Sequence, residues 1–344
     1  MKKLAIVGAT GVVGRCVLKV LEEENIDVDE YIFMASSRSK GKRLEFKGKE
    51  YIVQELTEDS FKKDDIDYAI FSAGAETAKR FAPIAAKCGT IVVDNSSAFR
   101  MDKDVPLIVP EVNADEISNN KGIIANPNCS TIQAVVPLKV MDCLYKIKRV
   151  VYSTYQAVSG AGRYGIEDLE NGIVNYYKKN FEGNNDKYVL NKFNYPIFNN
   201  VIPHIDLFME NGYTKEEMKM INETRKILNK PELKVTATCA RVPIFNSHAE
   251  SINVEFENDF KMDELIFELK KKAGIIVMCD IENNEYPLPT IATGTNEIYV
   301  GRIRRDYSVQ YGVNFWVVAD NIRKGAATNA VQIVEELIKI KNRK

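Results

Sequence analysis

The stretch Leu4-Ala5-Ile6-Val7-Gly8-Ala9-Thr10-Gly11-Val12-Val13-Gly14 decides the fold of this chain. Its first four residues are apolar and predict a buried strand, and residues 12–24 predict a helix with one apolar side. The glycines between them permit a tight turn and a close approach of backbone to a pyrophosphate, while the helix N-terminus supplies N–H donors. The spacing G-x-x-G-x-x-G is a variant of the usual fingerprint, and such turns also occur for purely steric reasons. In this strand–turn–helix context the stretch indicates a nucleotide site.

Short apolar runs alternate with helical patterns beyond this stretch. We expect a helix at residues 76–88 and further strands at residues 31–35, 67–72, 90–94, 107–109 and 122–125. This alternation is typical of βαβ units with right-handed crossovers. The fold class is therefore α/β, with a Rossmann-like parallel sheet domain.

The pattern changes after Asn128 and predicts a second, α+β domain. Its expected helices cover residues 130–145 and 214–229, the latter opened by a Thr214/Glu217 capping box. A glycine-punctuated loop is expected at 159–165, and strands at residues 149–156, 234–239, 248–256, 299–304 and 313–318. The apolar stripe of a helix at 324–340 has to dock on another element, and we expect that element to be the N-terminal sheet. The predicted domains are thus 1–128 plus 322–344, which binds the nucleotide, and 129–321, for catalysis and dimerisation.

Composition narrows the class of protein. Lys and Arg number 47 against 48 Asp and Glu, so no one-sign field exists to hold nucleic acid or anionic lipid. The run Lys261–Lys272 is interpreted as a solvated helix face. The N-terminal apolar run is too short for a leader, and no stretch approaches the ~20 apolar residues of a membrane span. Six scattered cysteines without C-x-x-C argue against disulfides, and no ligand spacing supports a metal site. A reducing cytoplasm fits best.

The choice of cofactor is predicted from the end of the second strand. NAD enzymes usually have Asp or Glu there, to accept from the ribose 2′-hydroxyl. This chain has Ser36-Ser37-Arg38-Ser39-Lys40 instead. An arginine with neighbouring hydroxyls suits a 2′-phosphate, although the same residues could form an ordinary polar loop. We therefore expect NADP.

Cys129 is the candidate nucleophile. It follows Asn126-Pro127-Asn128 at the carboxyl end of a strand and precedes the helix at 130–145, where the helix dipole favours a thiolate. Pro137 should kink that helix. The remaining cysteines fall within apolar patterns and are expected to be small core residues: Cys16, Cys88, Cys143, Cys239 and Cys279.

A thiol nucleophile usually needs a base, and the chain has two histidines. His248 lies beside a strong strand candidate, just after Arg241-Val242-Pro243-Ile244-Phe245. It is the expected partner of the thiol, although an arbitrary histidine is more often structural. His204, which follows Ile202-Pro203, is the second choice.

At these residues the chain resembles the aspartate-semialdehyde dehydrogenase family. The matching segments run in family order across nearly the whole chain: 8–14, 36–39, 95–100, 109–113, 126–133, 156–162, 216–219, 241–248 and 300–304. The resemblance implies reversible, NADPH-dependent reductive dephosphorylation of L-4-aspartyl phosphate to L-aspartate 4-semialdehyde. This reaction leads to lysine (through diaminopimelate), threonine, methionine and isoleucine. It also implies a homodimer or homotetramer, with the uninterpreted residues 163–213 contributing to a subunit interface.

Roles for individual residues follow from the same resemblance. Cys129 would form an acyl thioester, His248 would act as general acid/base, and Gln156 would orient the thioester. Arg100, Asn128 and Lys219 would bind phosphate, whereas Arg241 and Glu216 would hold the α-carboxylate and α-amino groups. Without the resemblance, Glu216 and Lys219 would be interpreted as a surface ion pair. The implied cofactor site comprises Gly8, Thr10, Gly11, Val12, Val13, Gly14, Ser36, Ser37, Arg38, Ser39, Ser72, Gly74, Ser159, Gly160 and Asn321.

Other classes of protein are less compatible with these residues. An N-acetyl-γ-glutamyl-phosphate reductase typically has Tyr-Pro after its cysteine, whereas Cys129 precedes Ser130-Thr131. A phosphorylating glyceraldehyde-3-phosphate dehydrogenase would have an acidic residue after the second strand. The motifs leave open a related malonyl-CoA reductase. A nucleotide sensor with a dead site would not need Cys129 and His248 together.

Overall fold

The computed structural model describes residues 2–62, 65–183 and 189–342. The chain forms two compact units. Unit 1 comprises residues 1–136, 222–231 and 323–344, and unit 2 comprises residues 137–221 and 232–322. Among the helices described, none is long and apolar enough to cross a membrane.

Unit 1 is built on a six-stranded sheet in which all neighbouring strands are parallel. Its order is β5-β2-β1-β6-β7-β8, the doubly wound arrangement whose direction reverses between β1 and β6. The strands are β1 (Lys3–Val7), β2 (Glu30–Ala35), β5 (Gln54–Glu55), β6 (Tyr68–Phe71), β7 (Ile91–Asp94) and β8 (Ile123–Ala125). The predicted Rossmann-like sheet is confirmed.

One predicted strand of unit 1 is wrong. Residues 107–109 form only an isolated parallel bridge between Leu107 and Ala125. Pro106 has no N–H to donate, and Pro110 begins a helix, so the segment between them is too short to make a ladder. The hairpin of β3 (Arg43–Phe46) and β4 (Lys49–Ile52) was not predicted.

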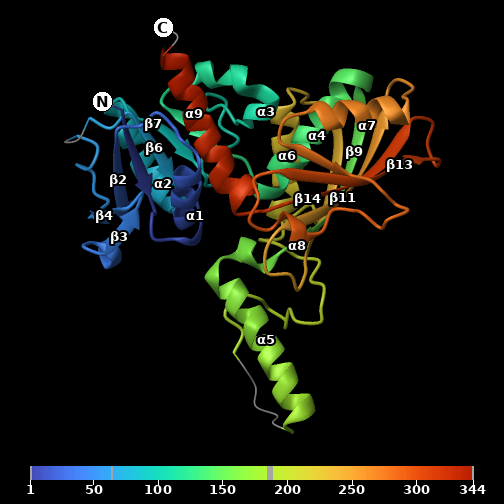
Figure 1. Cartoon of the computed structure of the whole chain (residues 1–344), viewed down its shortest axis with the longest axis horizontal. Helices are drawn as coiled ribbons and strands as arrows, with labels where there is room; N and C mark the ends of the chain where they lie inside the picture. The colour runs from blue at the N-terminus through green and yellow to red at the C-terminus, as the bar shows by residue number, and fades with distance from the viewer. Residues whose placement is uncertain (1, 63–64, 184–188, 343–344) are drawn as a thin grey trace. The chain divides into compact units, whose positions relative to one another are not determined.

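Helices cover both faces of this sheet (Figure 1). On one face α1 (Val12–Glu23) and α9 (Asn329–Asn342) share a core with Leu4, Ile6 and Tyr68. On the other, α2 (Ala75–Lys87) packs over Ala5, Val7 and Phe71. The predicted docking of the C-terminal helix on the N-terminal sheet is therefore confirmed. A π-helix, η4 (Arg323–Thr328), precedes α9, and the short α3 (Pro110–Asn113) and η2 (Ala114–Asn119) precede β8.

Unit 2 contains a mixed sheet of order β10-β9-β11-β14-β13-β12. Its outer pairs, β10 with β9 and β12 with β13, are parallel, whereas the inner pairs are antiparallel. The strands are β9 (Ile147–Gln156), β10 (Lys234–Arg241), β11 (His248–Phe256), β12 (Ile275–Met278), β13 (Ile298–Asp306) and β14 (Gly312–Ala319). The predicted α+β second domain is confirmed.

The helices that follow β8 include two that the sequence predicted, α4 (Cys129–Tyr145) and α6 (Lys215–Ile227). The Thr214/Glu217 capping box is present, with Thr214 N–H 2.7 Å from Oε2 of Glu217 and Glu217 N–H 3.3 Å from Oγ1 of Thr214. The run 261–272 is the helix α7 (Met262–Lys271), and α8 (Pro289–Ala292) is a single turn.

The helix α5 (Arg163–Phe181) corrects the predicted loop at 159–165. It extends away from the sheet of its own unit (Figure 1). Ile166 and Leu169 of α5 pack into a small core with Val158 and Ile197, whereas the aromatic residues Tyr164, Tyr176 and Phe181 of this helix are exposed. Of the segment 163–213, for which an interface was expected, residues 184–188 lie outside the described residues.

Candidate active site

The glycine turn after β1 has no room for side chains. Gly8 has a φ of +87°, and a Cβ on it would lie 2.6 Å from the carbonyl oxygen of Ser72. A Cβ on Gly14 would lie 2.1 Å from the carbonyl oxygen of Gly8. Gly11 directly precedes α1, so Val12 and Val13 form its first turn. This open backbone cradle at the switch point fits a dinucleotide pyrophosphate.

The segment after β2 lies beside this turn. Ser37–Ser39 form the short helix η1, in which Arg38 is exposed and Ser39 is buried. Oγ1 of Thr10 lies 3.4 Å from Oγ of Ser39, which brings the glycine turn and the predicted 2′-phosphate segment together. Residues 36–40 offer a guanidinium, an ammonium and hydroxyls to a ligand, and no carboxylate.

A chain of amide side chains crosses the carboxyl ends of β6, β7 and β8. Asn95 donates to Oγ of Ser72 at 2.7 Å, Asn126 donates to Oδ1 of Asn95 at 2.6 Å, and Asn329 donates to Oδ1 of Asn126 at 2.7 Å. Gly74, with a φ of +86°, caps the start of α2 near Ser72. These hydrogen bonds fix the edge of the sheet at which Rossmann-like folds bind ligands. Asn95 and Asn126 were not predicted as site residues, although each directly follows a strand.

Cys129 is the first residue of α4 and is half-buried. Asn128 caps this helix, since its Oδ1 accepts the N–H of Ser130 at 3.0 Å and its carbonyl accepts the N–H of Ile132 at 2.9 Å. The predicted placement at a helix N-terminus is confirmed. Of the six cysteines, all of them within the described residues, Cys129 alone occupies such a position.

The other cysteines follow the prediction only in part. Cys239 is buried, and its burial raises the pKa of the thiol far above its usual value, so it is unreactive. Cys16 and Cys279 are half-buried. Cys88 and Cys143 are exposed, which contradicts the expectation that they are core residues. Cys88 is the C-cap of α2, and Cys143 lies in the last turn of α4, where helix ends reach solvent.

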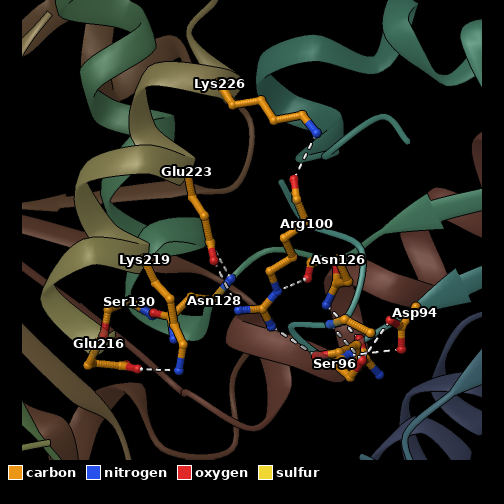
Figure 2. Close-up of polar contacts among 12 residues, drawn as sticks. Asp94, Ser96, Arg100, Asn126, Asn128, Ser130, Glu216, Lys219, Glu223 and Lys226 are labelled. Atoms are coloured by element: carbon orange, nitrogen blue, oxygen red, sulfur yellow. Dashed lines mark hydrogen bonds and ion pairs between the residues drawn. The ribbon is translucent and has the colours of Figure 1, made fainter. Parts of the chain in front are cut away.

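Arg100 is 8% exposed and binds three groups of unit 1 (Figure 2). Its Nε donates to the carbonyl oxygen of Asn126 and its Nη2 to that of Asn95, both at 2.9 Å. Its Nη1 lies 3.1 Å from Oε1 of Glu223. The other carboxylate oxygen of Glu223 accepts the backbone N–H of Asn128 at 2.6 Å. Glu223 was not predicted as a site residue.

In unit 2, three predicted residues lie at one end of the sheet. The register of the parallel pair β9–β10 sets Gln156 opposite Arg241, each at the carboxyl end of its strand. His248 begins β11, whose next residue, Ala249, pairs with Tyr155. Arg241 Nη1 donates to the carbonyl oxygen of Ala157 at 2.7 Å. The structure therefore brings Gln156, Arg241 and His248 together.

His248 is fully buried, and its Nδ1 accepts the backbone N–H of Ala157 at 3.0 Å. Burial, and then the charge of Arg241, lower the pKa of His248 well below its ordinary value. The ring is therefore neutral at pH 7. Because Nδ1 accepts a hydrogen bond, the ring proton resides on Nε2, so the imidazole presents an N–H donor on that side.

Glu216 and Lys219 form an ion pair on α6 (Figure 2). Nζ of Lys219 lies 3.0 Å from Oε2 of Glu216 and 2.8 Å from Oδ2 of Asp206, and Nε2 of Gln156 lies 3.2 Å from Oε1 of Glu216. Burial alone would lower the pKa of Lys219, but the charges and hydrogen bonds of Glu216 and Asp206 outweigh it, and the pKa is raised. Glu216 thus binds both the Lys219 cation and the side-chain amide of Gln156.

Ser159 and Asn321 are also in contact in unit 2. Nδ2 of Asn321 donates to Oγ of Ser159 at 3.1 Å, while its Oδ1 accepts the N–H of Ser247 at 2.9 Å. Gly160 follows Ser159 in the short helix η3 (Val158–Ala161). Asn321 thus links Ser159 to Ser247, the residue that precedes His248.

His204, the second choice of base, shares a cavity with Arg241 that His248 does not line. Its ring stacks on Phe208 with centroids 4.2 Å apart, and it lines a cavity of about 570 Å³ in unit 2. Arg241 and Asp206 also line this cavity, whereas Gln156 and His248 do not. Within the described ranges, no group of three or more His, Cys, Asp or Glu could hold a metal ion.

Comparisons with known proteins agree with this fold. The family described as "Semialdehyde dehydrogenase, NAD binding domain" matches residues 3–120, and "Semialdehyde dehydrogenase, dimerisation domain" matches residues 138–324. These two matches show that the protein is a semialdehyde dehydrogenase, an oxidoreductase with a nucleotide-binding domain.

Individual relatives narrow the class. An aspartate-semialdehyde dehydrogenase of Aquifex aeolicus is 56% identical, with 98% of both chains covered. Aspartate semialdehyde dehydrogenase II of Vibrio cholerae, solved in complex with ASA, superposes with a TM-score of 0.92 at 45% identity over 98% of each chain. The Candida albicans enzyme, solved with NADP, has a TM-score of 0.75 at 26% identity, again over 98% of each chain. The chain belongs to the aspartate-semialdehyde dehydrogenase family.

Proposed function

We propose that this protein catalyses the reversible, NADPH-dependent reductive dephosphorylation of L-4-aspartyl phosphate to L-aspartate 4-semialdehyde. Membership of the family supports this reaction. The observation that carries the proposal is the position of Cys129, half-buried at the first residue of α4 and directly after the cap residue Asn128. The helix dipole favours the thiolate there.

The thiol step divides one difficult reaction into two easier ones. The Cys129 sulfur attacks the acyl carbon, and the C–O bond to phosphate breaks. Inorganic phosphate is released, and the acyl group stays on the enzyme as a thioester. When bound, the dinucleotide supplies the hydride that reduces this acyl group. The C–S bond then breaks, which yields the aldehyde and regenerates the thiolate.

His248 is the proposed acid/base. Its neutral ring carries the proton on Nε2, the form that donates to an oxygen gaining negative charge. Gln156 would orient the thioester. Both side chains are buried and are fixed at the same end of the unit 2 sheet.

Several charged residues suit the charges of the substrate. Arg100, Asn128 and Lys219 are proposed to bind phosphate, which requires several donors and positive charges. Arg241 is proposed to bind the α-carboxylate and Glu216 the α-amino group. Lys219 is firmly charged, in support of its role.

NADP is the proposed cofactor, bound by unit 1. The cradle at Gly8 and Gly14 fits the pyrophosphate, and Arg38 with Ser36, Ser37 and Ser39 suits a 2′-phosphate. Further proposed cofactor-binding residues are Thr10, Gly11, Val12, Val13, Ser72, Gly74, Ser159, Gly160 and Asn321. The relative from Candida albicans, solved with NADP, supports this choice.

The setting of the enzyme is proposed from the same family. Residues 1–128 with 322–344 would form the NADP-binding domain, and residues 129–321 the catalytic and dimerisation domain. The assembly would be a homodimer or homotetramer in the cytoplasm, serving the synthesis of lysine, threonine and methionine. The matched dimerisation domain supports the assembly.

The decisive experiment assays phosphate- and NADP-dependent oxidation of aspartate semialdehyde by the wild type and by Cys129→Ala. We expect activity in the wild type and its loss in the variant. Substantial activity in Cys129→Ala would show that the thioester assignment is wrong. Cys239→Ala, which removes a buried and unreactive thiol, serves as the matched control.

A further inference from the structure

Glu223 is a buried carboxylate in contact with two proposed phosphate-binding residues. It lies on α6 and is 1% exposed. One oxygen accepts from the guanidinium of Arg100 at 3.1 Å, and the other accepts the backbone N–H of Asn128 at 2.6 Å (Figure 2). We propose that Glu223 is a positioning residue for phosphate binding, which fixes Arg100 and the turn before Cys129 together. This inference rests on the proposed function.

A carboxylate is an unexpected neighbour for a site that binds a phosphate dianion, since like charges repel. Its presence is explained by the two donors that it faces. An ionised carboxylate only accepts hydrogen bonds, whereas an amide of the same shape would turn an NH2 group toward either Arg100 or Asn128. Only an acidic side chain can satisfy both donors at this position.

The contacts of Arg100 leave it able to bind an anion. A guanidinium has five N–H donors in a planar fork. Within the part of the chain that the structure describes, three of them bind Asn126, Asn95 and Glu223. One N–H on each terminal nitrogen remains to donate to an anion such as phosphate. Glu223 therefore orients the guanidinium while it uses only one of its N–H donors.

Lys226, one turn further along α6, holds the backbone of the same segment. Its Nζ donates to the carbonyl oxygen of Arg100 (Figure 2) and to those of Asp102 and Val105, each at 2.8 Å. Residues three apart on a helix share a face. From this one face of α6, Glu223 binds the side chain of Arg100 and Lys226 binds the backbone of residues 100–105. This double anchor supports a positioning role for Glu223.

The test measures steady-state constants for aspartate semialdehyde, NADP and phosphate in the oxidative direction. For Glu223→Gln we expect the KM for phosphate to rise about ten-fold or more, the effect of losing a hydrogen bond to a charged group. The KM for NADP should stay unchanged. Arg100→Lys should also raise the phosphate KM, and the double variant should be no worse than the worse single variant, because Glu223 acts through Arg100. Glu232→Gln removes an exposed carboxylate shortly after the same helix and should change nothing.

Two outcomes would overturn the proposal. A lower phosphate KM in Glu223→Gln would show that the carboxylate acts only as a repelling charge. Independent, multiplicative effects of the two substitutions would show that Glu223 does not act through Arg100. If Glu223→Gln does not fold, Glu223→Asp decides: it keeps the charge, cannot reach both donors, and should raise the phosphate KM, whereas an unchanged value contradicts the proposal.

A binding measurement separates this inference from the proposed function. Inorganic phosphate should raise the Tm of the wild type, and that rise should shrink in Glu223→Gln but not in Glu232→Gln. An enzyme that does not oxidise aspartate semialdehyde but shows this pattern would refute the function and retain the positioning role. An active wild type with equal phosphate-induced shifts in all variants would refute the positioning role alone.

Discussion

Gly160 lies directly against His248. A Cβ atom on Gly160 would be 3.2 Å from Nε2 of His248 and 3.0 Å from Nη1 of Arg241. These distances are shorter than ordinary van der Waals contact, so a side chain at Gly160 would push either the imidazole or the guanidinium away. Both groups are buried and bound to Ala157, which leaves them little freedom to move. The glycine is therefore required by the side chains beside it as well as by any cofactor.

Gly160→Ala should lower kcat about ten-fold or more, because displacements well below 1 Å at a reacting group are costly. The fold should persist, since the added methyl displaces side chains and not the sheet. Steady-state kinetics and a melting curve check both statements. Wild-type kcat with an unchanged Tm would show that the contact has no catalytic consequence.

Arg38→Asp should weaken NADPH binding far more than NADH binding. The substitution replaces the exposed guanidinium after β2 with the acidic type of residue that accepts from a 2′-hydroxyl. Fluorescence titration with both dinucleotides measures the two Kd values. Equal weakening of both would remove the basis for preferring NADP.

The stability of the wild type should fall as pH drops below about 6.5 in part through His248. Its folded pKa lies well below the unfolded value of 6.5, so in this range the unfolded state binds a proton that the folded state does not. One such group contributes a slope of at most about 1.4 kcal/mol per pH unit. Urea unfolding between pH 7.5 and 5 should therefore show a shallower pH dependence in His248→Gln. Parallel curves for the two proteins would contradict the assignment.

Lys324→Met should destabilise unit 1. Lys324 is 1% exposed, and its Nζ lies 2.7 Å from Oε1 of Glu111 and 2.8 Å from Oε1 of Gln332. Removing one partner of a buried ion pair typically costs about 3–5 kcal/mol, because the other charge stays buried. Lys339→Met, which removes an exposed pair on α9, should cost about 1 kcal/mol at most. Chemical denaturation compares the two, and equal losses would contradict the prediction.

The sequence predicted the elements that carry strong periodic or apolar signals. Segments that are buried in or against the sheet must be largely apolar, so their pattern is recognisable in the sequence. Examples are Leu4–Val7, Ile91–Asp94 and the apolar stripe of α9. The two-residue strand β5 is Gln54-Glu55, which is too short and too polar to show a strand pattern. Helix α5 buries few apolar residues and exposes aromatic ones, so its signal in the sequence is weak.

Site residues that stand in a local sequence motif were predicted, whereas a site residue that is defined only by a tertiary contact was missed. Cys129 and the glycine turn stand in local contexts that fix their geometry. The pairing of Arg100 with Glu223 joins residues 123 positions apart, which no local pattern reveals. One signal was available: Glu216, Lys219 and Glu223 are spaced i, i+3 and i+7, which places them on one face of α6.

The docking of α9 on the first strands has a consequence for biosynthesis. Leu4, Ile6 and Tyr68 share their core with Val331, Val334 and Leu337, which leave the ribosome more than two hundred residues later. During translation α1 can cover only part of that face, and the part that α9 covers stays open to aggregation or chaperone capture until the C-terminal helix is made. The core around the N-terminal strands is therefore completed only after α9 has been synthesised.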